Sequence, residues 1–360
     1  MKTKNKKIRV AILCGGKSAE HEISLLSAHN VIQALNPTKY DIVIVGIDKN
    51  GSWFLPKTNL WLTTSEKLPA FISPQTKRQG TISPIFLSSD KPADVIFPVL
   101  HGPLGEDGTM QGLLKLMNIP FVGAGVLGSA IGMDKDVMKR LLKEADISIA
   151  KFLVFHQHKR KHIQFATVVR QLGLPIFVKP ANLGSSIGVS KVTNQKEFER
   201  AIDVAFSFDT KILVEQAVKG REIECSILGN KEEMIASLPG EIILHDEFYS
   251  YKTKYLDPHG ASLGIPAKLS TQVIKKVQAT AIKTCQVLCI EGMSRVDCFV
   301  TPNNKVYVNE VNTIPGFTQI SMYPKLWEAS GIPYSILLDK LITLAIKRHQ
   351  RDNALKTSVE

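Results

Sequence analysis

The chain has few cysteines, and their number and surroundings exclude a disulfide framework. Its 360 residues include five cysteines, an odd number, and most of them are flanked by apolar residues. This is the pattern of reduced, buried thiols in a cytoplasm. Cys285 and Cys289 are spaced to share one face of a helix, but no second pair accompanies them. A zinc site is therefore not expected.

Long hydrophobic runs are also missing from the sequence. No stretch approaches the length that a transmembrane helix needs. A basic start leads into the apolar run Val10 to Cys14, but Gly15 and Gly16 end this run before it reaches the length of a secretion signal. We therefore expect a cytoplasmic protein with no membrane partner.

Acidic residues are outnumbered, 33 against 45 lysines and arginines, which gives a net charge of +12 and a pI of about 9.3. Basicity of this size fits either a nucleic-acid surface or pockets for small anions. Much of the excess lies at the two termini, and no aromatic residue interleaves with those charges. We therefore expect solvated tails and no nucleic-acid partner.

The first third of the chain alternates between strand and helix patterns, in a chain long enough for two or three domains. Continuous apolar runs predict buried strands at 8–13, 40–47 and 94–100, and a helix with apolar residues over 25–35 follows the first strand. Glycine-rich loops stand at strand ends, where open parallel sheets place their ligands. The segment 58–91 is rich in Ser, Thr, Pro and Lys and is interpreted as a surface insertion.

Two of these loops carry reactive side chains. The first spans 15–22, with Ser18 expected as the helix N-cap and Glu20 at the start of the helix. A helix dipole favours a carboxylate at this position, so a purely structural role stays open. The second loop spans 101–108, where three glycines stand beside a histidine and two acids. Glycines in such a loop allow a ligand to approach the backbone closely.

The middle third has features of a phosphate-binding site. A helix is expected from Asp134 to about Leu142, and Lys179 points from the apolar strand 175–180. A lysine so placed either extends to solvent or binds an anion. The next loop, GSSIG at 184–188, would present backbone N–H groups and hydroxyls to a phosphate chain. It is neither a Walker A loop nor the dinucleotide fingerprint, so NAD is not expected.

Near the C-terminus, two expected strands carry polar residues on one face. Arg295 and Asp297 lie in one strand, and the next strand, 306–312, ends with Glu310 and Asn312. Residues two apart in a strand point to the same face, so Glu310 and Asn312 lie together and Asp297 can sit opposite them. Two carboxylates and an amide oxygen suit Mg²⁺, which usually bridges substrate phosphates. A solvated outer face is the alternative.

Taken in order, these segments resemble the D-alanine–D-alanine ligases of the ATP-grasp superfamily, from Val10 to roughly Leu344. Each loop alone is degenerate, but the ordered combination is highly specific. The matching motifs are GGKSAEHE (15–22), HGPLGEDG (101–108), MDK (133–135), GSSIG (184–188), EFYSYKTKY (247–255), RVD (295–297) and NEVNTIPGFT (309–318).

The resemblance implies an α/β protein with the three-domain ATP-grasp fold. A Rossmann-like N-terminal domain would span residues 1–128. Two α+β ATP-grasp subdomains would span 129–218 and 219–360, the second with the metal site and a lid at about 245–263. The implied reaction is the ATP-dependent ligation of two D-alanines to D-alanyl-D-alanine through a D-alanyl phosphate, for peptidoglycan synthesis and hence cell-wall biogenesis and cell shape. Members of the family usually form homodimers, so a homodimer is expected.

The resemblance also implies the cofactors. ATP is expected with two divalent ions, Mg²⁺ or Mn²⁺, and Asp297, Glu310 and Asn312 match the metal ligands. The residues that match ATP contacts are Lys135, Lys179, Gly184, Ser186, Glu215, Gln216, Ala217, Val218, Glu222 and Lys254.

On the substrate side, Glu20 resembles the carboxylate that holds the ammonium of the first D-alanine, in a hydrogen-bond chain with Ser185 and Tyr255. Arg295 and the N–H of Gly316 resemble the donors that stabilise the tetrahedral oxyanion. The remaining matches are His101, near the first D-alanine, and Ser321, at the carboxylate of the second.

Other ligase activities stay open. Related ATP-grasp carboxylate–amine ligases share the metal and phosphate parts but lack the SAEHE segment at 18–22 and the tyrosine-rich lid. Ligases that make D-alanyl-D-lactate lack the tyrosine matching Tyr255, which this chain keeps, so an amine nucleophile is indicated. A D-alanyl-D-serine ligase differs through the volume of its second pocket, which the sequence does not give.

Overall fold

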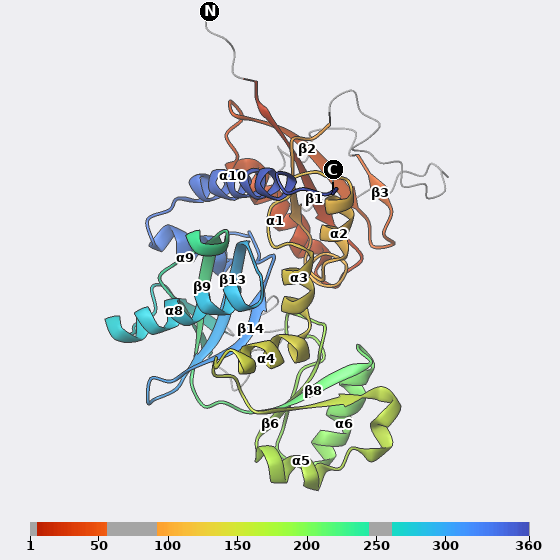
Figure 1. Ribbon diagram of the computed structural model, residues 1–360. Coiled ribbons are helices and arrows are strands. Elements are labelled where there is room, and N and C mark those ends of the chain that lie inside the picture. The colour runs from red at the N-terminus through yellow and green to blue at the C-terminus, as the bar shows by residue number, and fades with distance from the viewer. Residues whose placement is uncertain (1–5, 56–91, 245–260, 360) are drawn as a thin grey trace, which may run out of the picture.

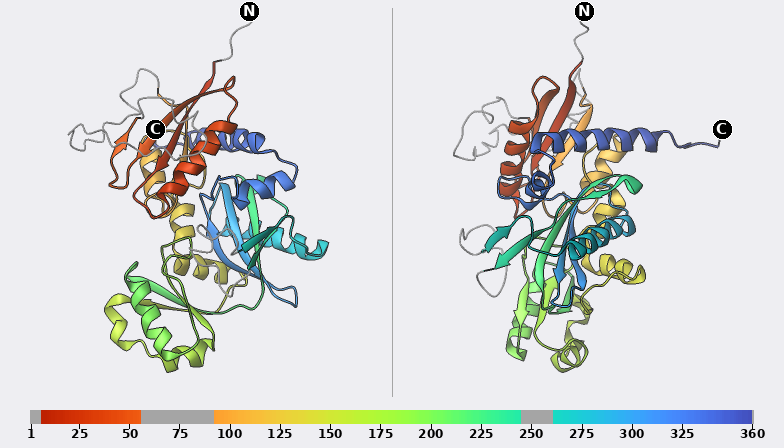
Figure 2. Two further views of the ribbon diagram at one scale, coloured as in Figure 1. Left: turned by 180° about the vertical axis from the view of Figure 1, so that it is seen from behind. Right: turned by 90° about the vertical axis from the view of Figure 1, so that its left-hand side faces the viewer.

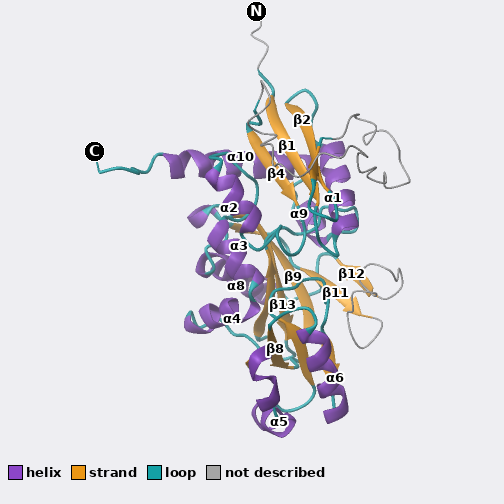
Figure 3. Ribbon diagram, turned by 90° about the vertical axis from the view of Figure 1, so that its right-hand side faces the viewer, coloured by secondary structure: helices purple, strands orange, loops and turns teal. Residues whose placement is uncertain are grey.

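The computed structural model describes residues 6–55, 92–244 and 261–359, which form three parts stacked along the long axis of the molecule (Figure 1, Figure 3). Figure 2 shows the same arrangement from two further sides. The insertion expected at 58–91 lies outside the described residues. The expected lid also lies outside them, apart from residues 261–263.

The first part is built on a four-stranded sheet in the order β3-β2-β1-β4, in which β1 runs parallel to both of its neighbours. Alternate residues of β1 from Val10 to Cys14 pack against α1 on one face and α2 on the other, which is why this stretch of the strand is apolar and buried. The elements are β1 (Ile8–Gly15), α1 (His21–Ala34), β2 (Tyr40–Ile47), β3 (Trp53–Phe54), β4 (Val95–Val99), α2 (Thr109–Leu116) and α3 (Val126–Met133).

The expected N-cap at Ser18 is wrong, because α1 begins only at His21, with Glu20 in the N-cap position. Ser18 instead closes a turn, in which its Oγ accepts the N–H of Glu20 at 3.1 Å. The two preceding glycines have φ values of +92° and +99°, and they turn the chain sharply before the helix starts. Glu20 therefore lies at the end of the loop, in the N-cap position, rather than inside the first helical turn.

The last helix of the chain, α10 (Tyr334–Asn353), returns to the first sheet and lies beside it (Figure 1). Its fully buried Leu337, Leu338 and Leu341 join the same core as Val10 and Ile12 of β1. The three sheets fall within the three ranges expected for the domains, and α10 links the last range to the first. The exact domain boundaries stay a prediction.

The middle part holds an antiparallel sheet in the order β5-β8-β6-β7, packed against α5 and α6 through one apolar face. Its opposite face is left for polar residues such as Lys179 and Glu215. The elements are α4 (Lys135–Glu144), β5 (Phe152–His156), a 3₁₀ helix (Gln157–His162), α5 (Phe165–Leu172), β6 (Ile176–Pro180), β7 (Ser190–Val192), α6 (Gln195–Phe206) and β8 (Lys211–Gln216).

The third part is a six-stranded antiparallel sheet with β9 and β13 at its centre, in the order β12-β11-β9-β13-β14, with β10 paired to β9. Helix α8 packs on one face and buries the cysteines of β9 and β13. The elements are β9 (Arg221–Gly229), a 3₁₀ turn (Lys231–Glu233), β10 (Ile235–Ala236), β11 (Gly240–Leu244), β12 (Ala261–Gly264), α8 (Thr271–Val287), β13 (Gly292–Val300), β14 (Val306–Asn312) and α9 (Met322–Ala329).

The five cysteines are free thiols, four of them buried. Burial raises the pKa of Cys14 and of Cys225 to about 12, so these thiols stay protonated. Cys285 and Cys289 do not share a helical face, because α8 ends at Val287 and Cys289 lies beyond it with φ at +55°.

Among the described helices, none is by itself long and apolar enough to cross a membrane. The pair α9 and α10 passes on length and composition alone, with a bend of 106° between the two helices.

Candidate active site

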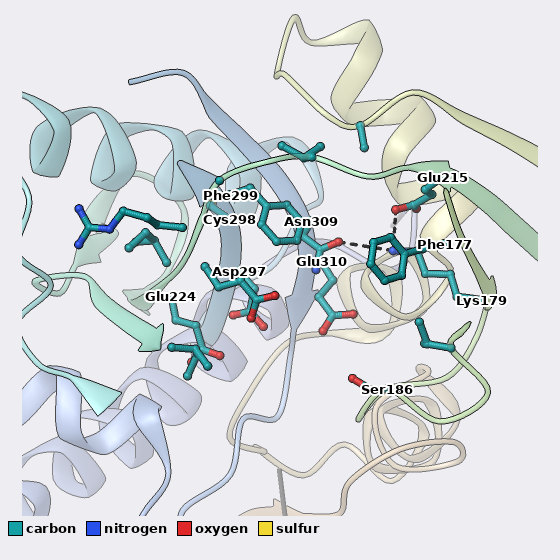
Figure 4. A pocket seen from close by; sticks show the side chains of 18 of the residues that line it. Phe177, Lys179, Ser186, Glu215, Glu224, Asp297, Cys298, Phe299, Asn309 and Glu310 are labelled. Atoms are coloured by element: carbon teal, nitrogen blue, oxygen red, sulfur yellow. Dashed lines mark hydrogen bonds and ion pairs between the residues drawn. The ribbon is translucent and has the colours of Figure 1, made fainter. Parts of the chain in front are cut away.

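A cleft of about 440 Å³ lies between the sheets of the middle and third parts (Figure 4). Strands β6 and β8 form one wall, and β9, β13 and β14 form the other. The expected ATP and metal residues that line it are Lys135, Lys179, Ser186, Glu215, Gln216, Val218, Glu222, Asp297 and Glu310. The structure therefore brings together side chains from four separate motifs in one cavity.

One wall of the cleft carries a buried lysine–carboxylate cluster centred on Glu215. Lys179 Nζ lies 2.7 Å from one oxygen of Glu215, and Lys139 Nζ lies 3.2 Å from the other. Lys179 also donates to Asn309 Oδ1 at 3.4 Å, as Figure 4 shows. Burial works to raise the pKa of Glu215, but the charges of Lys139 and Lys179 outweigh it and lower that pKa. Glu215 thus stays ionised and holds Lys179 at the cleft.

Lys139 belongs to the same cluster, although no sequence motif singles it out. Its side chain is 0% exposed, and burial lowers its pKa to about 8 against the opposing charge of Glu215. A lysine so deeply buried is rare without a partner. The available signal was its spacing of four residues from Lys135, which places both lysines on one face of α4.

Replacing Lys139 with methionine is expected to raise the KM for ATP by about tenfold, with a smaller effect on kcat. Glu215 would then have Lys179 alone to balance its buried charge, and the ion pair between them would compete more strongly with the nucleotide. The measurement is initial rate against ATP concentration. Lys143→Met, an exposed lysine one turn later on α4, is the matched control. An unchanged KM in the Lys139 variant would contradict the role.

Lys135 connects two of the expected motifs at the edge of the cleft. It opens α4, whose N-cap Asp134 accepts the N–H groups of Asp136 and Val137. Lys135 Nζ donates to the carbonyl oxygen of Leu183 at 2.6 Å and lies 3.5 Å from Glu310 Oε2. The start of the helix therefore fixes this ammonium between the GSSIG loop at 184–188 and the expected metal ligands.

The GSSIG loop at 184–188 has the backbone conformation of an anion-binding site. Ser185 and Ser186 have φ values of +53° and +58°, a left-handed conformation that serine seldom adopts. Ile187 N–H closes the turn on Gly184 at 3.1 Å. Strained turns of this kind cluster at ligand-binding loops and present successive N–H groups to anions.

The expected metal ligands meet across β13 and β14 as the alternation of these strands predicts. Asp297 pairs with Glu310 in the strand register, and Arg295 pairs with Asn312. Asn312 Nδ2 donates to Asp297 Oδ2 at 2.9 Å. Carboxylate and amide oxygens are the donors that a divalent cation such as Mg²⁺ prefers, so this set fits the cation in its chemistry. Over residues 6–55, 92–244 and 261–359, no group of three His, Cys, Asp or Glu side chains is placed to hold a metal ion. The two carboxylates of this site would therefore need the Asn312 amide oxygen as their third ligand.

Arg295 is the central cation of this wall. Its guanidinium binds Asp297 through two bonds of 2.7 Å and lies 2.9 Å from Glu224 Oε2. Burial works to lower its pKa, but Asp297 and Glu224 raise the pKa above its ordinary value. No sequence motif singles out Glu224. It stands opposite Asp297 on the neighbouring strand β9, a pairing that only the sheet register reveals.

A second, smaller pocket of about 40 Å³ opens next to the cleft. It is lined by the expected substrate and catalytic residues Glu20, His101, Ser185, Arg295 and Gly316, by Gly184, which was expected at the ATP site, and by Glu106, Asn312 and three others. Ser185 and Arg295 line both cavities. The two spaces therefore meet at a hydroxyl and a guanidinium.

Glu20 joins the three loops around this pocket. It is 7% exposed and accepts a short hydrogen bond from Ser185 Oγ. Its Oε2 also lies against Gly102, where φ is +79° and an added Cβ would come within 3.2 Å of that oxygen. The glycine is therefore favoured by the left-handed backbone and by the closeness of Ser18 Oγ, which would lie 2.8 Å from the added Cβ.

The turn after β14 brings Gly316 and Ser321 together. Ser321 Oγ accepts the N–H of Thr318 at 3.0 Å, and an added Cβ at Gly316 would lie 2.7 Å from the same oxygen. His101 reaches this turn through its Nδ1, which is 3.0 Å from the carbonyl oxygen of Ile314.

Two family models match the chain: one described as D-ala D-ala ligase N-terminus over residues 9–124, and one described as D-ala D-ala ligase C-terminus over residues 141–343. D-alanine–D-alanine ligase A of Escherichia coli strain K12 is 49% identical over 364 residues, which cover 98% of this chain and 100% of that protein. D-alanine–D-alanine ligase of Oceanobacillus iheyensis is also 49% identical, over 98% of this chain and 99% of that protein. The chain belongs to the D-alanine–D-alanine ligase family.

Solved structures agree with this family membership. The D-alanine-D-alanine ligase from Coxiella burnetii has a TM-score of 0.82 and 39% identity, covering 97% of this chain and 96% of that chain. The VanG D-Ala:D-Ser ligase from Enterococcus faecalis has a TM-score of 0.80 and 35% identity, covering 94% and 100%. The predicted family and the ATP-grasp fold are therefore confirmed. As a member of this ATP-dependent family, the chain uses ATP with a divalent metal and small-molecule substrates.

The roles expected for individual residues in this family member stay predictions, although most of the residues gather at the two cavities. Tyr255 and Lys254 lie outside the described residues. Ala217 lines neither cavity and instead donates its N–H to the carbonyl oxygen of Pro175 at 3.1 Å. Ser321 contacts the turn that carries Gly316 rather than the pocket itself.

Proposed function

We propose that this chain joins two molecules of D-alanine in an ATP-dependent, ADP-forming reaction that passes through D-alanyl phosphate. The product, D-alanyl-D-alanine, would supply peptidoglycan synthesis. Two relatives named D-alanine–D-alanine ligase share 49% identity with it over nearly the whole chain. The sites expected for ATP and for the first amino acid meet in this structure, which supports the same reaction.

The observation that carries the proposal is the shared boundary of the two cavities. Ser185 and Arg295 line both the large cleft, which suits a nucleotide, and the small pocket, which suits an amino acid. A carboxylate in the small pocket would therefore face the terminal phosphate in the cleft. Phosphoryl transfer needs this approach, because its catalysis is mostly positioning and charge neutralisation.

In the first step, a carboxylate oxygen of the first D-alanine attacks the γ-phosphorus. The bond from phosphorus to the β–γ bridging oxygen breaks, and ADP leaves. Glu20 holds the ammonium of the amino acid, and the ammonium groups of Lys135 and Lys179 neutralise the phosphates. When bound, a divalent cation at Asp297, Glu310 and Asn312 would neutralise further phosphate charge. We propose two ions, of Mg²⁺ or Mn²⁺.

In the second step, the amine of the second D-alanine attacks the carbonyl carbon of the acyl phosphate, and the proton that it loses leaves with the phosphate. The carbonyl oxygen becomes an oxyanion, to which the Arg295 guanidinium and the Gly316 N–H donate. The bond from carbon to the phosphate oxygen then breaks, and phosphate leaves as the peptide bond forms. Glu224 and Asp297 keep the Arg295 guanidinium aimed at the boundary of the two cavities.

The test is release of phosphate from ATP and Mg²⁺ in the presence of D-alanine, L-alanine, D-serine or D-lactate, with the product identified by mass spectrometry. We expect D-alanine to give D-alanyl-D-alanine with one phosphate per dipeptide, and L-alanine to give none. Phosphate release with another amino acid or peptide, and none with D-alanine, would refute the proposal.

A D-alanyl-D-serine ligase is the second candidate, because the Enterococcus faecalis D-Ala:D-Ser ligase is 35% identical with a TM-score of 0.80. Higher identity to relatives named for D-alanine makes this candidate the weaker one. The same assay with D-alanine and D-serine together separates the two candidates. A D-alanyl-D-serine ligase would give mainly the mixed dipeptide, and a D-alanine–D-alanine ligase would give mainly D-alanyl-D-alanine.

We also propose that the chain acts in the cytoplasm as a homodimer, as its family does. Light scattering of the purified protein at several concentrations tests the oligomeric state. A mass near 39.8 kDa at every concentration would contradict the dimer.

A further inference from the structure

Glu106 joins two segments that are far apart in the sequence and that both line the small pocket. Its Oε2 accepts the N–H of Gly102 at 2.8 Å, within the loop that follows β4. Its Oε1 accepts the N–H of Ile314 at 3.1 Å, in the turn that follows β14. One carboxylate therefore bridges the first and third parts of the molecule.

Other contacts cross between the same two segments. His101 Nδ1 lies 3.0 Å from the carbonyl oxygen of Ile314, and Thr313 Oγ1 donates to the carbonyl oxygen of Glu106 at 3.4 Å. On the far side of Gly316, the N–H of Phe317 donates to Ser27 Oγ at 3.1 Å. The expected oxyanion donor, the Gly316 N–H, thus lies between two residues that the first part anchors.

The charge of Glu106 depends on its surroundings in the pocket. Burial and the charge of Glu20 raise its pKa to about 8, against the two N–H bonds and Arg295, which act to lower it. The titratable or charged groups that face the pocket with it are Glu20 before α1, His101 after β4 and Arg295 on β13. A carboxylate accepts N–H bonds more strongly than a neutral acid. A substrate ammonium on Glu20 would therefore favour the ionised, tightly bound form of Glu106.

We propose that Glu106 is a positioning residue, which ties the loop at 101–106 to the turn at 313–316 and so holds His101 and the Gly316 N–H at the substrate pocket. This inference rests on the proposed function. It assigns Glu106 a role in the acyl-transfer step and no contact with the nucleotide, because Glu106 does not line the large cleft.

The first experiment compares Glu106→Gln with Asp107→Asn. Asp107 is the adjacent carboxylate, and it accepts two N–H bonds inside its own loop, from Leu104 at 2.8 Å and Thr109 at 2.9 Å. We expect Glu106→Gln to lower kcat/KM for D-alanine by about 10- to 100-fold while KM for ATP stays within about twofold. Asp107→Asn should change neither value by more than about twofold. If Glu106→Gln does not fold, Glu106→Asp keeps the charge but is too short to reach both N–H groups, and it should show the same selective loss.

The pH profile supplies a readout that a purely structural role would not move. The ionised form of Glu106 gains population as the pH rises through about 8. In the unaltered enzyme, kcat/KM for D-alanine should therefore rise through this region. Glu106→Gln should lack that rise, and Asp107→Asn should retain it.

Hydrogen exchange at the Ile314 amide separates this inference from the proposed function, because it needs no turnover. Glu106→Gln should speed exchange at this amide, which now donates to Glu106. If D-alanine released no phosphate in the unaltered enzyme but exchange rose as expected, the proposed function would fail and the bridge would stand. Unchanged exchange, an unaltered pH profile, or an equal loss in Asp107→Asn would each overturn the inference.

Discussion

Replacement of Arg295 with alanine is expected to lower kcat by about 10²- to 10³-fold, the scale of losing one donor to a transition-state oxyanion. Arg295 is 7% exposed and is the cation that lines both cavities. Its loss removes a charge-assisted donor at the point where the tetrahedral intermediate forms. It also leaves Glu224 and Asp297 without their shared guanidinium. The measurement is the steady-state rate at saturating ATP, Mg²⁺ and D-alanine.

Two further variants separate chemistry from stability in this prediction. Arg295→Lys keeps the charge but loses the two-bond contact with Asp297, so we expect most of the rate loss to persist. Arg348→Ala removes a buried arginine that binds backbone carbonyls remote from both cavities, including that of Phe121 at 2.8 Å. This control should lose stability while its folded fraction keeps kcat. A mild rate loss in Arg295→Ala would mean that the oxyanion is stabilised elsewhere.

Replacement of Glu310 with glutamine is expected to raise the free Mg²⁺ needed for half-maximal rate by about tenfold or more. A neutral amide oxygen is a weaker ligand for a hard cation than a carboxylate. Glu310 also lies opposite Asp297 in the strand pair, so both expected acidic ligands belong to one rigid unit. The same change leaves Lys135 without its carboxylate neighbour at 3.5 Å, which should lower kcat further.

The measurement for Glu310 is the rate as a function of free Mg²⁺ at saturating ATP. Tyr307→Phe, three residues earlier on β14, is the control and should give an unaltered titration, because Tyr307 packs with Lys305 instead. A metal titration of Glu310→Gln that matches the unaltered enzyme would contradict the assignment of this residue to the metal.

Patterns within a single strand or helix predicted individual elements, and the three-domain fold was predicted from the resemblance that the ordered motifs carry. The apolar run at the start of the chain predicted β1, and the alternation at 306–312 correctly placed Glu310 and Asn312 with Asp297. The loop motifs also predicted the substrate residues that line the small pocket. Each of these motifs follows the end of a strand, and the strand ends meet at this pocket. The start of α1 was wrong, because the serine that suits an N-cap forms a preceding turn instead.

Contacts between distant segments could not be derived from local patterns. Glu224 was missed because its partner Arg295 is reached through the pairing of β9 with β13. Lys139 was missed because a lysine on an amphipathic helix normally reaches solvent, and only tertiary packing buries it beside Glu215. Glu106 lay inside a motif already singled out, but its bond to Ile314 spans 208 residues.

Transfer of oxygen from substrate to phosphate tests the central claim most directly. The enzyme would be supplied with D-alanine labelled with ¹⁸O in its carboxylate, together with unlabelled ATP, and the released phosphate would be analysed by mass spectrometry. If the carboxylate attacks the γ-phosphorus across the boundary formed by Ser185 and Arg295, each phosphate leaves with one ¹⁸O atom. Phosphate without ¹⁸O, released together with dipeptide, would show that no acyl phosphate forms and would contradict the account.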